Sequence, residues 1–398
     1  MKKMMIFALC MAFLAFAKAQ TQDELNAWND VNVYEINKLY PRTDVVPQGD
    51  YSILLNGNWK FNWVDNPSKA PEDFFKADFD ASSWNTIKVP ANWELNGFGI
   101  PIYVNVNNEF RPNQPPFAPM ADNPVGCYIT DFEIPESWNG RQIYINFGAV
   151  KSAYYVWVNG RFVGYTEDAK TNSDFDITKF CQTGKNRLAV KCYRFSNGSY
   201  FECQDFWRIS GIERDVRIYA KPELNIYDYE VHAGLDETYE NCVLSIDVTL
   251  QSTKGKIKKN NELVAVVRYG DVQFRMTKSL NDLQFELDGD GYYYAKTVLE
   301  PADGQNVGKV KKWSAEEPNL YEMSLVIMDR KGNAIETLTN HIGFRTAEVK
   351  DGKFLVNGQY VLIKGKSPKD VIVKVKDNLD IIPATVDVAV AAPCKPNL

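Results

Sequence analysis

The sequence predicts an all-β protein made of β-sandwiches. Short segments rich in Val, Ile, Tyr and Phe recur along the chain, and turn-forming clusters separate them. No long stretch shows a helical hydrophobic period with caps. The 398 residues are 45% hydrophobic and 13% aromatic, which is enough for two or three domains with cores of their own. These features favour packed sandwiches over a helical or a disordered chain.

The N-terminal segment predicts export. Lys2 and Lys3 precede a short apolar run at 4–16, and the small-x-small pattern at 17–19 follows it. This arrangement is typical of a signal peptide covering residues 1–19, with a mature start at Gln20 and a periplasmic or secreted location. A membrane anchor is disfavoured because the run is shorter than the about 20 residues that cross a bilayer. We expect no membrane span elsewhere.

Strands are expected at four segments of high β-propensity, namely 142–147, 153–158, 186–193 and 215–220. Asn159 and Gly160 stand between two apolar runs, and both residue types tolerate the positive φ of a tight hairpin turn. One short helical turn is expected at 71–75.

The composition changes twice along the chain. Residues from about 55 to 221 are dense in Trp, Tyr, Pro and Gly, and Lys221-Pro222 is interpreted as a linker. Residues 223–345 are less aromatic, and their number fits an immunoglobulin-like sandwich. A hairpin is expected at 351–358 and a strand at 360–364. The tail from Lys366 contains no Trp, Tyr or Phe.

Charge and thiol content exclude several functions. The net charge is -6 without a basic stripe, so we expect no nucleic-acid partner. No CxxC spacing occurs and the chain has only His232 and His341, so a zinc site is disfavoured and both histidines are interpreted as structural. Buried free thiols are the expectation for the six cysteines beyond the signal peptide, which are Cys127, Cys181, Cys192, Cys203, Cys242 and Cys394.

Seven segments occur in a fixed order: NGNWKF at 56–61, VPANWE at 89–94, PIYVNV at 101–106, NPVGCY at 123–128, GSYFECQDFWRISGI at 198–212, WSAEEPNLY at 313–321 and IGFR at 342–345. This series resembles the N-terminal part of glycoside hydrolase family 2, and the third and fifth segments are similar to those of its β-galactosidases. The resemblance implies a jelly-roll domain at 20–221 and an immunoglobulin-like β-sandwich at 222–346. Residues 347–398 would then be a remnant of the barrel entry plus a divergent tail.

The family pattern breaks after Gly365, where Lys366-Ser367 replaces the segment that leads into a (β/α)₈ barrel. A barrel needs about 250 residues, and in this family it carries both catalytic glutamates. We therefore expect a truncated β-galactosidase-like chain with no catalytic residues, inactive alone in hydrolysis of terminal β-galactosides. The alternatives are an exported carbohydrate-binding module and a fragment that docks on a separate catalytic barrel chain.

Two positions match family contacts to the galactosyl unit, Asn105 and Asp205. The resemblance implies weak binding of galactose or a β-galactoside there, with Asp205 as a candidate ligand of an incomplete sodium site and with the family's magnesium site absent. A structural carboxylate paired with Arg208 and an ordinary turn Asn are the competing interpretations. Trp93 and Trp207 are either sugar-stacking rings or core residues, and core packing is favoured because large aromatic side chains dominate cores.

Overall fold

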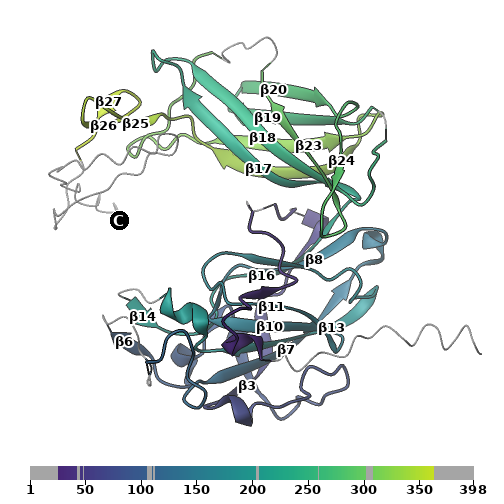
Figure 1. Ribbon diagram of the computed structural model, residues 1–398. Helices are drawn as coiled ribbons and strands as arrows, with labels where there is room; N and C mark the ends of the chain where they lie inside the picture. Colours follow the sequence, from purple (N-terminus) through teal and green to yellow (C-terminus); the bar gives the residue numbers. More distant parts are fainter. Residues whose placement is uncertain are drawn as a thin grey trace, which may run out of the picture. The chain divides into compact units, whose positions relative to one another are not determined.

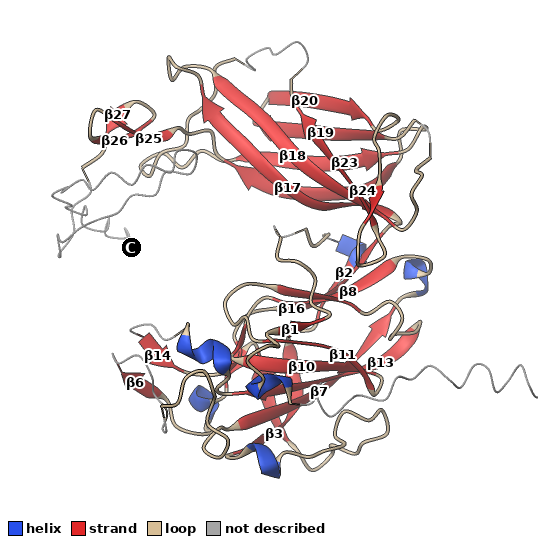
Figure 2. Ribbon diagram, viewed as in Figure 1, coloured by secondary structure: helices blue, strands red, loops and turns tan. Residues whose placement is uncertain are grey.

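The computed structural model describes residues 26–42, 45–47, 49–104, 110, 113–202, 206–258, 260–301 and 308–362. These residues divide into two compact units, with the boundary between Glu223 and Leu224 and with Val45 belonging to the second unit. Strands make up most of the regular structure (Figure 2). The signal peptide expected at 1–19, the tail from Lys366 and the cysteines Cys203 and Cys394 lie outside the described residues.

The helices of the described residues are short 3₁₀ turns: η1 (Ala27–Asn29), η2 (Gly49–Tyr51), η3 (Pro67–Lys69), η4 (Glu94–Asn96), η5 (Glu136–Trp138) and η6 (Asn197–Tyr200). The expected helical turn at 71–75 is wrong, since these residues form bends and turns. The all-β prediction is confirmed.

The larger sheet of the first unit has seven strands in the order β1-β11-β10-β13-β7-β3-β4. Their bounds are β1 (Glu35–Ile36), β11 (Arg161–Thr166), β10 (Ala153–Val158), β13 (Gly184–Tyr193), β7 (Val125–Ile134), β3 (Gly57–Val64) and β4 (Asn85–Val89). The expected hairpin between β10 and β11 is confirmed, with φ of 52° at Asn159 and 78° at Gly160. The predicted strands at 153–158 and 186–193 are confirmed within β10 and β13.

The second sheet of this unit has the order β12-β8-β16-β2, with bounds Ser173–Asp176, Gln142–Phe147, Val216–Lys221 and Ser52–Leu54. The strand expected at 142–147 is β8, and the one expected at 215–220 is β16, shifted by one residue. The first core contains side chains of both sheets, such as Trp59 and Phe61 from β3 and Ile145 and Phe147 from β8. The two sheets therefore form a sandwich (Figure 1).

The seven-stranded sheet is buried on both faces. Its other face packs on a second cluster that includes Trp28, Phe74, Tyr155 and Trp157. Covering both faces explains why all six residues of β10 are buried instead of alternating. Two smaller sheets complete the unit: β5-β15-β9, with bounds Ala91–Asn92, Gly211–Ile212 and Val150–Lys151, and β14-β6, with bounds Phe206–Arg208 and Ile102–Val104.

The second unit is a sandwich of two four-stranded sheets. One has the order β17-β18-β22-β21, with bounds Leu224–Leu235, Cys242–Ser252, Tyr293–Leu299 and Glu286–Leu287. The other has the order β20-β19-β23-β24, with bounds Val272–Ser279, Glu262–Tyr269, Tyr321–Met328 and Ala334–Ile342. Alternate residues of these strands, such as Leu244 and Ile246 of β18 and Leu325 and Ile327 of β23, fill the core between them.

A three-stranded sheet ends the described part of the second unit: β25 (Ala347–Lys350), β26 (Lys353–Val356) and β27 (Gln359–Tyr360). Tight turns with positive φ at 351–352 and 357–358 join these strands. The segment 351–358, predicted as a hairpin, is therefore the single strand β26 with a tight turn at each end. The strand expected at 360–364 is shorter, because β27 ends at Tyr360.

Candidate functional site

The sequence-predicted contacts Asn105 and Asp205 both lie outside the described residues, so their roles stay predictions. Their neighbours in the chain are described. β6 and β14 form an antiparallel ribbon in which Val104 pairs with Phe206, Tyr103 with Trp207 and Ile102 with Arg208. Asn105 follows Val104 and Asp205 precedes Phe206, so both positions adjoin the same end of this ladder in sequence. The ribbon therefore connects in sequence to both predicted positions, from segments far apart along the chain (Figure 1).

An exposed aromatic pair stands on this ribbon. Tyr103 is 57% exposed and Trp207 is 53% exposed, and they face each other across the two strands. Their ring centroids are 5.4 Å apart with an interplanar angle of 54°. Core packing was expected for Trp207, and this is wrong because a two-stranded ribbon leaves one face to solvent. The same expectation is confirmed for Trp93, which is fully buried against Phe61.

Buried charges lie at the base of the ribbon. Arg194 Nη2 donates to the backbone oxygens of Ile100 at 3.0 Å and of Arg208 at 3.2 Å. Its Nε lies 3.7 Å from Glu94 Oε1, and both side chains are almost inaccessible. Ser210 N–H donates to Glu94 Oε2 at 2.8 Å. Burial raises the pKa of Glu94, while the Ser210 N–H and the Arg194 charge oppose that rise.

The NPVGCY segment explains how Arg194 is held. Asn123 is fully buried, and its side-chain amide exchanges two hydrogen bonds of 2.9 Å with the backbone of Phe195. A Cβ on Gly126 would lie only 2.4 Å from the Trp93 ring, so a larger residue would displace that ring. The small residue and the amide therefore fix the strand end that precedes the Arg194 cluster.

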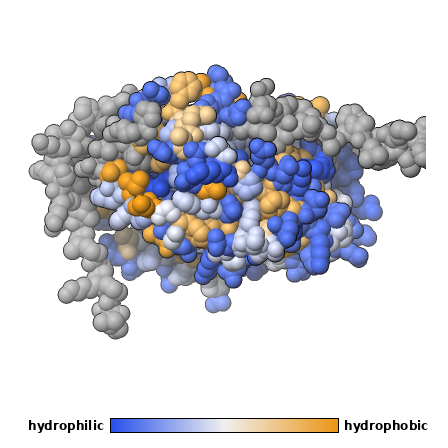
Figure 3. All heavy atoms as spheres, turned by 90° about the horizontal axis from the view of Figure 1, so that it is seen from below, coloured by the Kyte–Doolittle hydropathy of each residue, from blue (hydrophilic) through white to orange (hydrophobic). Residues whose placement is uncertain are grey.

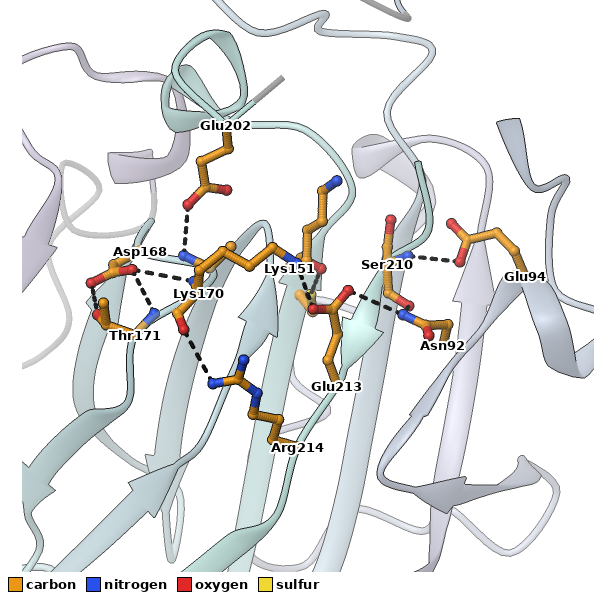
Figure 4. A network of polar contacts seen from close by, with 12 residues as sticks. Asn92, Glu94, Lys151, Asp168, Lys170, Thr171, Glu202, Ser210, Glu213 and Arg214 are labelled. Atoms are coloured by element: carbon orange, nitrogen blue, oxygen red, sulfur yellow. Dashed lines mark hydrogen bonds and ion pairs between the residues drawn. The ribbon is translucent and has the colours of Figure 1, made fainter. Parts of the chain in front are cut away.

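A second group of carboxylates joins two loops beside the ribbon. Glu167 Oε2 accepts from Gly198 N–H at 2.7 Å, and Glu202 Oε1 accepts from Ala169 N–H at 2.9 Å, so each loop receives a bond from the other. Figure 4 shows Glu202 directed at the loop that carries Asp168. Burial raises the pKa of Glu167 to about 7, despite hydrogen bonds from Tyr165 and Gly198, and it also raises the pKa of Glu202.

This contact network continues across the end of the sandwich (Figure 4). Lys170 Nζ lies 2.7 Å from Glu213 Oε2, and Asn92 Nδ2 donates to Glu213 Oε1 at 3.3 Å. Asp168 accepts from Lys38 Nζ at 3.0 Å. Such carboxylate, ammonium and amide groups can exchange hydrogen bonds with sugar hydroxyls. Glu202 belongs to the GSYFECQDFWRISGI segment, whereas no local sequence signal marks Glu167 as its partner.

The described residues contain no group of three or more metal-ligating side chains. The candidate sodium ligand Asp205 is outside them, so that site stays a prediction. His232 Nε2 lies 3.1 Å from Asp247 Oδ2 on an exposed strand pair. The thiol expectation is confirmed for Cys127, Cys192 and Cys242, which are buried and free, while the free Cys181 is partly exposed. Within the described ranges, no helix is both long and apolar enough to cross a bilayer.

Comparison with known families matches both units. The profile described as "Glycosyl hydrolases family 2, sugar binding domain" covers residues 53–222, and "Glycosyl hydrolases family 2" covers residues 224–345. The chain belongs to glycosyl hydrolase family 2. The family resemblance of the sequence motifs is thereby confirmed.

Curated relatives and a solved structure agree with this assignment. A β-galactosidase of Priestia megaterium is 37% identical over 79% of this chain and 30% of its own length, and one of Halalkalibacterium halodurans is 34% identical over 87% and 34%. The chain thus spans about a third of the length of these relatives. The crystal structure of a Bacteroides uniformis β-glucuronidase has a TM-score of 0.59 and 20% identity, over 79% of this chain and 35% of that one. At this identity the likeness concerns the fold.

Apart from Lys38, the described side chains of the candidate site lie within the region matched to the sugar binding domain. In the space-filling view, apolar residues form separate groups among hydrophilic ones on the face shown (Figure 3). The site thus combines two exposed rings with a rigid polar base, which are the elements that recognition of an amphipathic ligand requires.

Proposed function

We propose that this chain supplies the sugar-contacting and supporting domains of a β-galactosidase-type glycoside hydrolase, whose reaction is hydrolysis of terminal β-galactosides. The observation that carries the proposal is the 34–37% identity to two β-galactosidases over 79–87% of the chain. The ordered NPVGCY and GSYFECQDFWRISGI segments support it, since they build the ribbon and its base. Export to the periplasm or the medium is part of the proposal.

Asn105 and Asp205 are the proposed contacts to the galactosyl unit. A carboxylate accepts hydrogen bonds from neighbouring hydroxyls, and an amide donates and accepts, which suits a polyhydroxylated ring. The β6–β14 ladder supports a common location, because its last described pair joins the residues next to both positions. Asp205 is also the proposed protein ligand of a sodium ion shared with the sugar.

We propose that the 398-residue chain binds without cleaving. Retaining hydrolysis needs two carboxylates about 5–5.5 Å apart, flanking the scissile bond. In the family these belong to the barrel, and Asn105 and Asp205 contribute binding, which by itself leaves the barrier unchanged. The barrel would supply catalysis, and an association with a barrel on a separate chain is the alternative to a free carbohydrate-binding module.

A galactose titration followed by NMR tests the proposal. The wild-type chain is expected to bind galactose in the millimolar range, about -4 kcal/mol, and to bind it more tightly with sodium than with potassium. Asp205→Ala should remove binding and its sodium dependence, and Asn105→Ala should weaken binding. Glu133→Ala, which removes an exposed carboxylate of β7, is the matched control and should bind as wild type.

Equal binding by the wild type, Asp205→Ala and Glu133→Ala would refute the assignment of the sugar contact. Binding that is lost equally in Asp205→Ala and in the control would also refute it, because the loss would then reflect general destabilisation.

A further inference from the structure

Trp207 is the one exposed Trp of this protein. The chain has nine Trp residues, all of them within the described ranges, and the other eight are buried or half-buried. An aromatic side chain ordinarily buries 150–250 Å² of surface, so an indole that leaves about half of its surface in water loses much of that stabilising burial. Tyr103 is exposed to the same degree directly opposite, so the exposure belongs to the pair and its ribbon.

The two rings are held in a fixed arrangement. Trp207 and Tyr103 occupy paired positions of one antiparallel ladder. One guanidinium, that of Arg194, bonds the backbone of Arg208, which follows Trp207, and the backbone of Ile100, which precedes β6. Because a side chain with a 6% exposed fraction ties both strands together, the rings are preorganised and lose little freedom on binding.

We propose that Tyr103 and Trp207 form a stacking site for a pyranose ring, the one that follows the terminal galactosyl unit in a β-linked saccharide. This inference rests on the proposed function, because the terminal unit is placed at Asn105 and Asp205. A pyranose presents C–H groups on its faces and hydroxyls on its rim. The aromatic faces of Tyr103 and Trp207 would contact the C–H groups, and the indole N–H of Trp207 can donate to a hydroxyl of the rim.

The size of the pair favours a sugar over a protein as its occupant. Two half-exposed rings offer a small fraction of the about 800 Å² per partner that a standard protein interface buries. Their angle of 54° forms an inclined surface rather than a flat one. The pair also lies within the region matched to the sugar binding domain of the family. A protein seated on the same ribbon is the competing occupant.

The test compares lactose with galactose on a chain whose Trp side chains carry ¹⁵N. The spectrum contains nine indole signals, and Trp207→Phe identifies that of Trp207. Lactose is expected to shift this signal and to bind about two- to tenfold more tightly than galactose, the gain typical of one aromatic contact. Trp207→Ala should abolish the difference between the two sugars, and Trp207→Phe should keep it.

Tyr40→Ala is the matched control, since it removes an aromatic ring that is 81% exposed elsewhere on the unit, and it should preserve the preference for lactose. Asn105→Ala should weaken the binding of both sugars together and leave the ratio of their affinities unchanged, which separates this inference from the galactosyl assignment. An unmoved Trp207 signal with lactose would overturn the inference. So would a preference for lactose that survives in Trp207→Ala, or a Trp207 signal that responds to a protein and to no saccharide.

Discussion

Replacing Arg194 by Met removes the charge at the base of the ribbon while keeping much of its volume. The variant loses the bonds to the Ile100 and Arg208 oxygens and leaves Glu94 without the guanidinium that lies 3.7 Å from it. Breaking a buried pair by removing one partner costs about 3–5 kcal/mol, because the remaining charge is buried and uncompensated. For a unit of this size, about 1 kcal/mol shifts Tm by about 2–4 °C, so the expected fall is roughly 6–20 °C.

The decrease in Tm of Arg194→Met should depend on pH because Glu94 titrates. Burial raises the pKa of Glu94 in the folded protein above its ordinary value of 4.5. A raised folded pKa contributes stability that is complete below the unfolded pKa and is lost as pH rises through the folded pKa. Arg194→Met raises the folded pKa further, since the opposing positive charge is gone. The difference in Tm between wild type and variant is therefore expected to be smaller near pH 4, where only the lost bonds to the Ile100 and Arg208 oxygens contribute, than at pH 8.

Thermal unfolding followed by Trp fluorescence reports mainly on the first unit, which contains Arg194, because only Trp313 of the nine Trp residues lies in the second unit. Arg217→Met is the matched control. Its bridge to Asp215 has the shorter distance of 2.8 Å, but both side chains are about 40% exposed or more, so the expected cost is below about 1 kcal/mol. Equal decreases in Tm in the two variants, or an Arg194→Met decrease that does not change with pH, would show that the buried pair of Arg194 and Glu94 does not stabilise the first unit.

Three further outcomes are expected. Gly126→Ala places a methyl group 2.4 Å from the Trp93 ring and should cost about 1–3 kcal/mol in urea unfolding, whereas Gly289→Ala, which meets open space, should cost far less. Glu167→Gln should reduce the change of the unfolding free energy with pH between about 4.5 and 7, since the folded pKa of Glu167 is raised to about 7 and its contribution to stability is lost as pH rises through that value. Urea unfolding at pH 5 and pH 8 measures this change, and an equal change in wild type and variant would contradict the prediction. Mass spectrometry of the exported protein should find Gln20 as the first residue, and a retained Met1 would disprove export.

Local sequence patterns predicted several central strands of the first unit. The strands at 142–147 and 153–158 were found to the residue, and the Asn159-Gly160 turn was identified because positive φ at two positions has a strong residue preference. Helical prediction at 71–75 failed because propensity over one turn is too weak to decide between a helix and irregular turns.

The chemistry of the site was harder to predict because it depends on contacts between distant residues. Glu94 and Arg194 meet across 100 positions, and their pairing has no local signal. The exposure of Trp207 also follows from topology, since only strand pairing reveals that β14 belongs to a two-stranded ribbon and not to a sandwich. Residue type alone made the core the better expectation for this side chain.

The most direct test of the proposed function is turnover of a chromogenic aryl β-galactoside by the purified 398-residue chain, with Asp205→Ala measured in parallel. We expect no turnover by either protein at any concentration, together with millimolar galactose binding by the wild type alone. Turnover that scales with the concentration of the wild-type chain and disappears in Asp205→Ala would contradict the proposed function.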